Sequence, residues 1–285
     1  MKIRPLVSII ILNWNGKELT RDCLKSIERN TDYPNYELIV VDQGSKDGSV
    51  EMIEDGFPHV KLIRNKKNAG FSAGNNQGFK LSRGKYVYVL NNDTEVLKGW
   101  LVNIVKVMEN DERIAAAGSL QISPDKLGDA ESIMENKIEE VETAGGAAMI
   151  LRKKAIDKIG MFDDKHFSPI YGEENDWCYR ARNRGYRIVL VKNSGIIHIG
   201  EATNVKEYDK PYSFVLRETN RIKAMLFNLP AGRLIKFVPG LSLIFVKSIL
   251  HGQGHLIMKS YYSIWKDRKE ILKERKLRLS ILKKR

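Results

Sequence analysis

Short apolar segments alternate with amphipathic segments along the first two thirds of the chain, and this alternation limits the possible folds more than any other feature. The apolar segments cover residues 6–12, 37–41, 60–63 and 86–90. Their β-branched composition is typical of strands buried on both faces. After the first of them, Leu19, Cys23 and Ile27 recur every four residues, as on one face of a helix. Strands that alternate with helices form βαβ units, so the sequence predicts an α/β fold with a mostly parallel central sheet flanked by helices.

Polar residues stand directly after three of these predicted strands. Asn13, Asp42 and the run Asn91–Asp93 each follow an apolar segment. Parallel sheets bind ligands at the carboxyl ends of their strands, which is where these side chains would gather. The sequence therefore predicts a binding site at this edge of the sheet.

Composition narrows the class of protein. The chain has 285 residues, of which 42% are hydrophobic, enough for one large domain or for a domain with an appendage. The charged residues are spread rather than blocky, which excludes the disordered, collagen-like and coiled-coil classes. Cys23 and Cys178 are too few for a disulfide scaffold, so a reducing compartment is expected.

The net charge of +13 is unevenly distributed. Residues 1–205 contain 29 basic and 29 acidic residues, whereas residues 206–285 contain 19 basic and 6 acidic residues. The second part is also rich in Leu and Ile with a helical pattern. We therefore expect a neutral domain over 1–205 and a basic, amphipathic helical C-terminal extension over 206–285.

Six sequence blocks occur in the order and approximate spacing of a known enzyme family. They are Val7–Gly16, Ile39–Ser49, Asn68–Asn76, Leu90–Thr94, Gly145–Met149 and Gly172–Arg182. Over residues 5–228 the chain resembles family 2 glycosyltransferases with the GT-A fold, and among them the rhamnosyltransferase-like and galactofuranosyltransferase-like members. The resemblance implies that 1–205 is a GT-A (nucleotide-diphospho-sugar transferase) catalytic domain.

The same resemblance implies an activity. It is the inverting transfer of a sugar, with rhamnose as one candidate, from a UDP- or dTDP-linked donor. The implied acceptor is a hydroxyl of a glycan or of a lipid-linked molecule in the synthesis of cell-surface polysaccharide or glycoconjugate.

The resemblance puts the nucleotide sugar against Asn13, Asp42, Asn68 and Asn75. The Asp42 carboxylate can accept a hydrogen bond from a pyrimidine N3–H or a ribose hydroxyl, and it can equally cap the turn that follows. Family members usually have Asn where Gln43 stands. The glycine-containing loop from Asn68 to Asn75 permits close approach of a phosphate to a helix N-terminus, although many such loops only cap helices.

Asn91, Asn92 and Asp93 occupy the position of the family's Asp-x-Asp motif, on the nucleotide-sugar side. A hard cation, Mn²⁺ or Mg²⁺, needs oxygen ligands there to neutralise the departing diphosphate. Because Asn91 replaces the first acid, Asp93 alone supplies charge, and a turn that ends a strand is the structural alternative. His198 is the second expected metal ligand, and a structural histidine is the alternative.

Three acids cluster near a predicted helix start. An inverting transferase needs one carboxylate to take the proton of the acceptor hydroxyl. By position in the family motif, Glu174 is the expected base, Glu173 is the second candidate, and Asp176 completes the catalytic set by capping or orienting. Clustered acids repel, which raises at least one pKa. A negatively charged helix N-terminus favoured by the helix dipole is the structural alternative.

The same block supplies two expected acceptor contacts. Trp177 would form a platform for the acceptor or would simply pack in the core, and Arg180 follows it on the helix. All of these roles require that Asp93 and Glu174, although far apart in the chain, face one shared crevice.

Two other function classes stay open at this point. Asn91 in place of an acid suits a catalytically silent nucleotide-sugar-binding protein. The basic extension suits a nucleic-acid-binding protein, but no recognisable nucleic-acid module accompanies the charge, so no nucleic acid is expected as a partner.

The basic extension has two interpretations of its own. Residues 266–285 carry ten basic and three acidic residues with Ile and Leu interleaved. They form either a solvated helix with a packing stripe or an interfacial helix on an anionic membrane, aided by the aromatics Tyr261, Tyr262 and Trp265. The apolar segment 234–250 contains two lysines, a proline and a glycine, so we expect it at a surface rather than across a bilayer.

The N-terminal apolar run is short and lacks a small-residue cleavage site, so no signal peptide is expected. The expected location is the cytoplasm, with the extension on the inner face of the cell membrane. The oligomeric state is left open.

Overall fold

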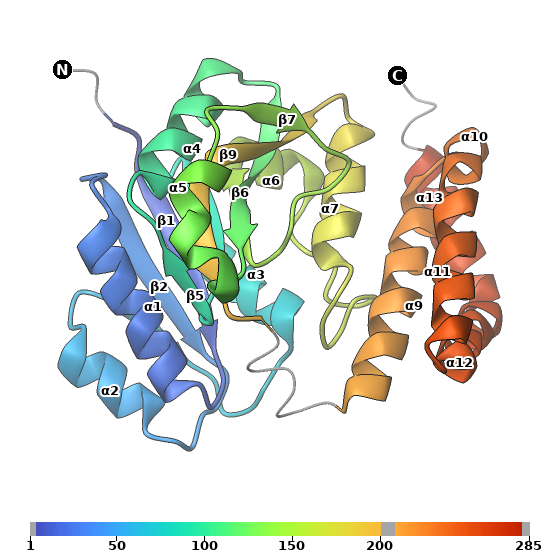
Figure 1. The fold of residues 1–285 in the computed structure, drawn as a ribbon, viewed down its shortest axis with the longest axis horizontal. Helices are drawn as coiled ribbons and strands as arrows, with labels where there is room; N and C mark the ends of the chain where they lie inside the picture. The colour runs from blue at the N-terminus through green and yellow to red at the C-terminus, as the bar shows by residue number, and fades with distance from the viewer. Residues whose placement is uncertain (1–3, 201–208, 281–285) are drawn as a thin grey trace.

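The computed structural model describes residues 4–200 and 209–280, and its centre is one sheet with strand order β3-β2-β1-β4-β8-β6-β9-β5, with β7 added beside β9 (Figure 1). The strands are β1 (Val7–Asn13), β2 (Tyr36–Asp42), β3 (Lys61–Arg64), β4 (Tyr86–Asn91), β5 (Thr94–Val96), β6 (Ile114–Ile122), β7 (Ile138–Glu140), β8 (Ala148–Arg152) and β9 (Arg187–His198). The first four strands in sequence are parallel to one another, and β8 runs antiparallel between β4 and β6. The predicted α/β fold, with a mostly parallel central sheet flanked by helices, is confirmed.

Helices cover both faces of the sheet. The helices of this part are α1 (Lys17–Asn30), α2 (Ser49–Gly56), α3 (Phe71–Leu81), α4 (Trp100–Asn110), α6 (Lys153–Ile159) and α7 (Glu173–Arg182). Ile9 and Ile11 of β1 pack with α1, α2 and α4, whereas Ile10 packs with α3, α6 and α7. Successive strand residues point to opposite faces, which explains why β1 is apolar throughout.

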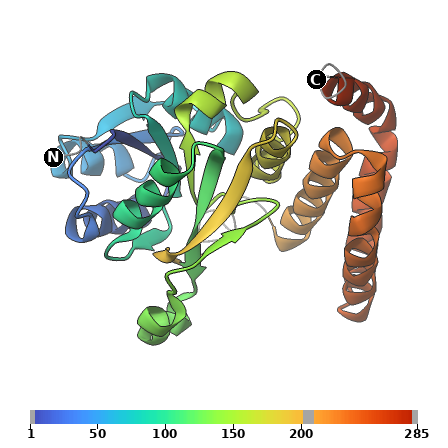
Figure 2. The ribbon, with the colours of Figure 1, turned by 90° about the horizontal axis from the view of Figure 1, so that it is seen from above.

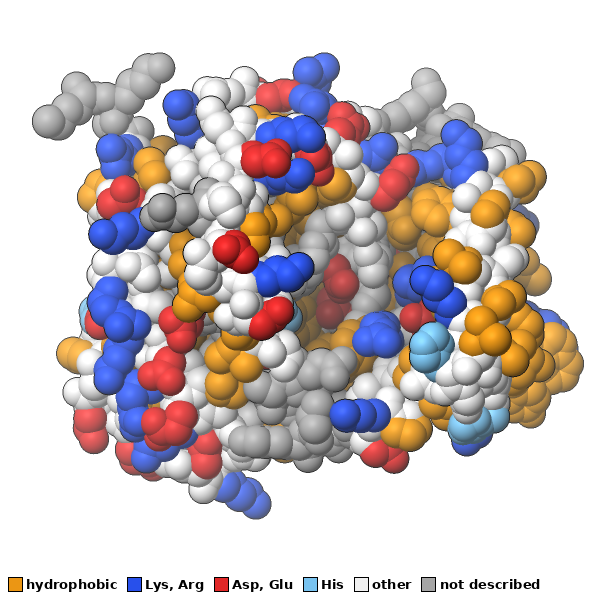
Figure 3. Space-filling model, in the orientation of Figure 1, with side chains coloured by type: hydrophobic (Ala, Val, Ile, Leu, Met, Phe, Trp, Pro, Cys, Tyr) orange, Lys and Arg blue, Asp and Glu red, His pale blue; other side chains and the backbone are white. Residues whose placement is uncertain are grey.

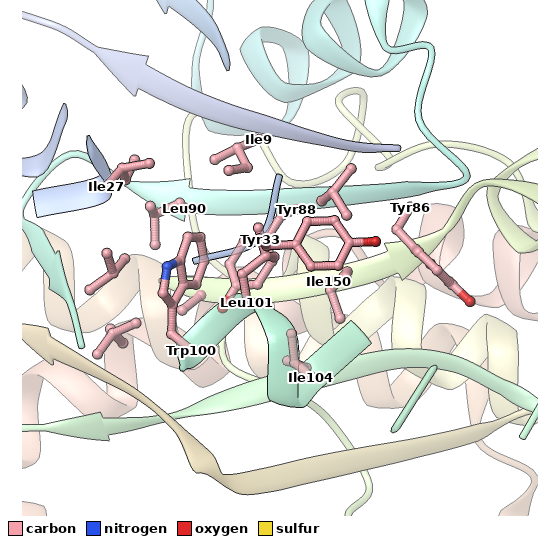
Figure 4. Close-up of a cluster of buried hydrophobic side chains, with 14 of the residues drawn as sticks. Ile9, Ile27, Tyr33, Tyr86, Tyr88, Leu90, Trp100, Leu101, Ile104 and Ile150 are labelled. Carbon is pink, nitrogen blue, oxygen red and sulfur yellow. The ribbon is translucent and has the colours of Figure 1, made fainter. Parts of the chain in front are cut away.

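The core on the α1–α4 face is built around aromatic side chains (Figure 4). The Tyr88 and Trp100 rings meet edge to face with centroids 4.8 Å apart. The Tyr88 hydroxyl is buried but hydrogen-bonded to Ser119 Oγ, so burial of this polar atom is compensated.

The strand order fixes where a ligand can bind. From β1 the chain proceeds to β2 on one side, and β4 lies on the other side of β1. Such a reversal of strand order opens a crevice at the carboxyl ends of the two strands. Asn13 ends β1 and Asn91 ends β4, so both predicted residues stand at this crevice.

The segment 124–140, predicted to be irregular, contains a 3₁₀ turn (Pro124–Asp129), the short helix α5 (Ala130–Ile133) and β7. The C-terminal extension forms helices beside α7 (Figure 2). They are α9 (Lys210–Asn228), α10 (Ala231–Leu234), a 3₁₀ turn (Ile235–Phe237), α11 (Val238–Leu250), α12 (Gly254–Lys266) and α13 (Arg268–Ser280). Helix α9 packs against α7, α12 and α13. The predicted boundary between 205 and 206 lies outside the described residues, and the division into two domains stays a prediction.

A bilayer crossing needs a long apolar helix, and none of the helices in the described ranges meets that requirement.

Candidate active site

Strand β5 brings Asp93 beside His198. Thr94 is in register with His198 in the antiparallel pair β5–β9, and the Ile199 N–H donates to the Asp93 carbonyl at 3.0 Å. His198 Nε2 consequently lies 3.3 Å from Asp93 Oδ1. Both atoms are buried, and neither has a well-formed hydrogen bond. Two buried polar atoms are therefore left facing each other without a satisfied partner.

This donor set fits a divalent cation held at an open site. A carboxylate oxygen and an imidazole nitrogen are both ligands for Mn²⁺, and Mg²⁺ is bound through the oxygen. Such ions are usually held by one or two side chains, with phosphate oxygens and water as the other ligands. Within residues 4–200 and 209–280 no cluster of three or more acids, histidines or cysteines forms a closed metal cage. Asp93 and His198 together fit the predicted metal role.

The two glutamates sit at the start of α7. Glu173 is 2% exposed and Glu174 is half-buried. Burial raises the pKa of Glu173 well above its ordinary value, and the adjacent Glu174 carboxylate raises it further. Burial also raises the pKa of Glu174. The stronger rise at Glu173 favours the proton on Glu173, which leaves Glu174 as the carboxylate that can accept one.

Gly172 makes this helix start possible. Its φ of 91° is in the left-handed region that favours glycine, and an added Cβ would lie 2.9 Å from the Phe167 ring and 3.0 Å from Asn220. Asn220, on α9, also donates to the Ile170 carbonyl at 3.1 Å. The first helix of the extension thus supports the turn that presents Glu173 and Glu174.

One cavity of about 250 Å³ joins these two clusters. Its lining includes Phe71, Asn91, Asp93, Gln121, Gly145, Gly146, Ala147, Ile170, Tyr171, Glu173, Glu174 and His198. Figure 3 shows the hollow near the centre of the molecule, with acidic colour in its depth. The prediction that Asp93 and Glu174 share one crevice is confirmed.

Asn13, Asp42 and Asn92 form a hydrogen-bonded network beneath the crevice and are absent from the cavity lining. Asn13 Nδ2 donates to Asp42 Oδ2 at 2.8 Å, and its Oδ1 accepts from Thr20 Oγ1 at 2.7 Å. Asn92 Nδ2 donates to Thr20 Oγ1 at 3.1 Å. Asp42 Oδ1 also accepts the N–H groups of the following turn, so the capping alternative is realised. A nucleotide contact by these three side chains stays a prediction.

The loop before α3 is held by its own contacts. Asn68 Oδ1 accepts from the Gly70 N–H at 2.9 Å, and Asn75, fully buried, donates to the Phe71 carbonyl. The Phe71 N–H donates to the Pro169 carbonyl at 2.7 Å, so this helix N–H already has a partner. A phosphate contact at this loop stays a prediction.

Gln43, noted in the sequence as a departure from the family, organises the same loop. Its Nε2 donates to the Gly70 carbonyl at 3.1 Å, and its Oε1 accepts from Asn65 and Ala69. A Cβ on Gly74 would lie 2.2 Å from Gln43 Nε2, so a larger residue there would displace the Gln43 side chain. The longer amide thus joins β2 to the loop.

Asp176 is fully buried and contacts Arg180, Asn228 and Arg278 rather than the cavity, so its orienting role in the catalytic set stays a prediction. Two predicted acceptor contacts on α7 are wrong in this structure. Trp177 is also fully buried, and its Nε1 donates to the Gly160 carbonyl at 2.8 Å, which excludes an acceptor platform. Arg180 is not an acceptor contact either, because its guanidinium donates to Asp176 and to the Ile159 and Met161 carbonyls.

The cavity also contains residues that sequence reasoning missed. Gln121 is the one amide side chain in β6, between Leu120 and Ile122, a signal that could have identified it. Tyr171 has a φ of 73°, unusual for a residue with a side chain. That backbone conformation could not be predicted, because Tyr is not a residue that favours it.

Comparisons of structure show the same architecture in enzymes that transfer sugars. The mannosyltransferase PcManGT from Pyrobaculum calidifontis, solved with GDP-Man and Mn²⁺, matches with a TM-score of 0.62 and 17% identity over 98% of this chain and 75% of that one. GalNAc-T7, solved with UDP, GalNAc and Mn²⁺, matches with a TM-score of 0.63 and 15% identity over 79% of this chain and 48% of that one. The fold is GT-A.

Sequence comparisons identify the family. Residues 8–150, half of the chain, match the family model described as "Glycosyl transferase family 2", and the chain belongs to this family. An uncharacterized glycosyltransferase of Haemophilus influenzae is 33% identical over 40% of this chain and 36% of its own length. Glycosyltransferase AglE of Haloferax volcanii is 25% identical over 65% of this chain and 64% of its own length. The chain thus spans less than two thirds of either relative.

Proposed function

We propose that this chain is an inverting, metal-dependent glycosyltransferase. It would move a sugar from a UDP- or dTDP-linked donor, with rhamnose as one candidate, to a hydroxyl of a glycan or lipid-linked acceptor. The observation that carries the proposal is the single cavity lined by Asp93 and His198 together with Glu173 and Glu174. Two proteins of the same fold support it, one solved with GDP-Man and Mn²⁺ and the other with UDP, GalNAc and Mn²⁺.

Glu174 is the proposed base. It is the more exposed member of the pair and the one whose pKa is raised less strongly. It would take the proton of the acceptor hydroxyl while the oxygen attacks the anomeric carbon from the face opposite the leaving group. Protonated Glu173 would donate rather than repel, which keeps two adjacent carboxyl groups compatible in a buried site.

Asp93 and His198 would hold Mn²⁺ or Mg²⁺, with phosphate oxygens as further ligands. A bound cation supplies charge that stabilises the departing nucleoside diphosphate. Asn91 leaves Asp93 as the one acid of the motif, so diphosphate oxygens would contribute a larger share of the coordination than in relatives with two acids.

A thermal-shift screen of nucleoside diphosphates and nucleotide sugars, with and without Mn²⁺, tests the proposal. A ligand that binds the native state raises the melting temperature by mass action. We expect the ligand-induced rise in melting temperature to be larger when Mn²⁺ is present. Asp93→Asn should abolish this additional rise. Asp22→Asn is the control and should keep it, because Asp22 is exposed on α1. Equal shifts with and without metal would contradict the metal role.

The silent-binder alternative is tested with the same ligands. A transferase hydrolyses its donor slowly when no acceptor is present, whereas a silent binder shows a thermal shift without hydrolysis. A nucleic-acid-binding role would require salt-dependent binding located in 206–285 and loss of function on its removal.

The acceptor side of the proposal includes an anionic membrane surface. Large apolar side chains on α11 and α12 are exposed, and they include Val238, Leu243, Val246, Ile249, Leu250, Met258, Tyr262 and Trp265. No acidic residue occurs between Glu218 and Asp267, whereas seven basic residues do. Apolar side chains bordered by cations suit an interface rich in anionic lipid. Within 266–285, by contrast, Ile271 and Arg278 face inward, which favours α11 and α12 as the contact elements.

A further inference from the structure

Asp176 joins the helix that carries the glutamates to two other elements. It lies on α7 shortly after Glu174, is fully buried and is absent from the cavity lining. Its Oδ2 accepts from Arg180 Nε at 2.8 Å, and its Oδ1 accepts from Asn228 Nδ2 on α9 at 2.7 Å. The remaining donor is Arg278 Nη1 from α13, 102 residues further along the chain.

Arg278 itself is held on all sides. Its Nη2 donates to Asp163, in the loop before α7, and its Nε donates to Glu274 at 2.9 Å. The guanidinium lies over the Phe227 ring, 4.7 Å from the centroid. Its side chain is only 11% exposed, although it belongs to the most basic segment of the protein. One planar guanidinium therefore connects α7, the loop before it and the end of the extension.

The geometry of this ion pair bears on position more than on overall stability. Buried ion pairs add little net stability, because desolvation offsets the Coulomb attraction, but breaking one leaves a buried charge without its partner. In Arg278 variants Asp176 would keep its hydrogen bonds with Arg180 and Asn228, so α7 would stay folded. The helix would lose the ion pair that holds it in position against α13. Glu173 and Glu174 stand at the start of that helix, where a small shift changes their place in the cavity.

Helix α13 does not depend on Arg278 for its attachment. Lys223 Nζ on α9 lies 2.7 Å from Asp267, Arg275 donates to the Leu226 carbonyl, and Ile271 is buried against α9. Removal of the Arg278 side chain should therefore change the position of α7 without detaching α13.

We propose that Arg278 of the C-terminal extension is a positioning residue for the active site, which sets the place of Glu173 and Glu174 through its contacts with Asp176 and Asp163. This inference rests on the proposed function for its catalytic consequence. It gives the end of the extension a role separate from any membrane contact.

The test compares Arg278→Gln with Lys276→Gln. Both remove one positive charge from α13, but Lys276 is exposed. Arg278→Gln should lower kcat about tenfold with an unchanged KM for the donor, because catalytic groups tolerate only small displacements. It should also speed amide hydrogen exchange in α7 without changing exchange in β1 and β4. Lys276→Gln should match the wild type, and Arg278→Lys, which keeps charge without the planar fork, should fall between them.

Each alternative result has a distinct meaning. Equal effects of both Gln variants would show that charge on α13 matters rather than position, and would overturn the inference. Faster exchange throughout the sheet with a parallel loss of melting temperature would show a merely structural role, and would also overturn it. If the wild type transfers no sugar, the proposed function fails, while the exchange measurement on α7 still tests the positioning contact.

Discussion

The adjacent residues Glu173 and Glu174 differ in exposure, and this difference assigns their chemistry. Both residues line the cavity, but Glu173 is the more buried and has the more strongly raised pKa. Glu174 lies beside Gly146, where a Cβ would be 3.6 Å from its carboxyl carbon. Glutamine can donate a hydrogen bond as a protonated glutamic acid does, but it cannot accept a proton as a carboxylate base does.

Glu174→Gln should therefore lower transfer at least about 100-fold, the usual contribution of a general base, and leave binding of the nucleotide sugar unchanged. Turnover and a direct binding titration measure the two quantities. Glu173→Gln is the internal comparison and should retain most of the activity. Unchanged transfer by the Glu174 variant would remove it from the mechanism, and the reverse ranking would exchange the two roles.

Glu173 should also shape the dependence of stability on pH. An acid whose pKa is higher in the folded than in the unfolded state binds more protons when folded, so its contribution is complete below the unfolded pKa and declines as pH rises toward the folded pKa. Glu173→Gln removes that decline. Relative to wild type, its melting temperature should improve as the pH rises above the ordinary Glu range near 4.3. A pH-independent difference in melting temperature would argue against a proton held by Glu173.

At the scale of elements, the turn into α7 is the most constrained connection at the site. Gly172 and Gly185 both have φ in the left-handed region, at 91° and 82°, but only Gly172 is enclosed by neighbours. A Cβ at Gly185 would meet nothing within 4 Å.

Gly185→Ala should destabilise the protein by about 1–2 kcal/mol through backbone strain alone. Gly172→Ala should cost about 1–3 kcal/mol more, because its Cβ would also overlap Phe167 and Asn220. Chemical denaturation gives both values, and transfer measured at a temperature where both variants are folded should fall only for Gly172→Ala. If both variants lost the same free energy of unfolding, α9 would be able to move away from the new Cβ at Gly172 without strain.

The central strands β1, β2 and β4 were predictable because each is a nearly continuous apolar run buried on both faces, a pattern that amphipathic helices do not share. The site was only partly predictable. Asn13, Asp42 and Asn91 could be placed at the crevice because strand ends meet there, and Glu174 because it follows a recognisable motif. The short strand β5, which brings Asp93 to His198, was missed, since three residues in one antiparallel pair leave no periodic signal.

The errors on α7 have one physical cause. Which face of a helix meets the core, the cavity or another helix depends on tertiary packing, which its own sequence does not specify. Trp177 and Arg180 were predicted to contact the acceptor, but both pack inside the protein. Asp176 was grouped with its acidic neighbours, although its side chain faces α9 and α13. The partner Arg278 stood in a segment whose charge pattern indicated only solvent or lipid.

At the scale of the whole molecule, the surplus of positive charge separates into two populations. Some cations of the extension are engaged internally, such as Arg278 with two aspartates and Lys223 with Asp267. Others border the exposed apolar side chains of α11 and α12. In Figure 3 hydrophobic side chains gather on the side of the molecule formed by these helices. The first group of cations would stabilise contacts within the fold, and the second would bind an anionic surface.

Leu250 offers a direct test of that surface. It is 77% exposed at the end of α11, and burial of a leucine side chain contributes about 1.5–3 kcal/mol, so Leu250→Asp should weaken vesicle binding at least about tenfold. Leu81→Asp is the matched control, because Leu81 is an exposed leucine at the end of α3 and its replacement should not change binding. Co-sedimentation with vesicles containing phosphatidylglycerol, compared with neutral phosphatidylcholine vesicles, measures the effect, and added salt should weaken binding to the anionic vesicles alone.

Equal binding to both kinds of vesicle would remove the electrostatic part of the proposal. No binding, together with a concentration-dependent mass that Leu250→Asp abolishes, would instead assign the surface to a second copy of the chain.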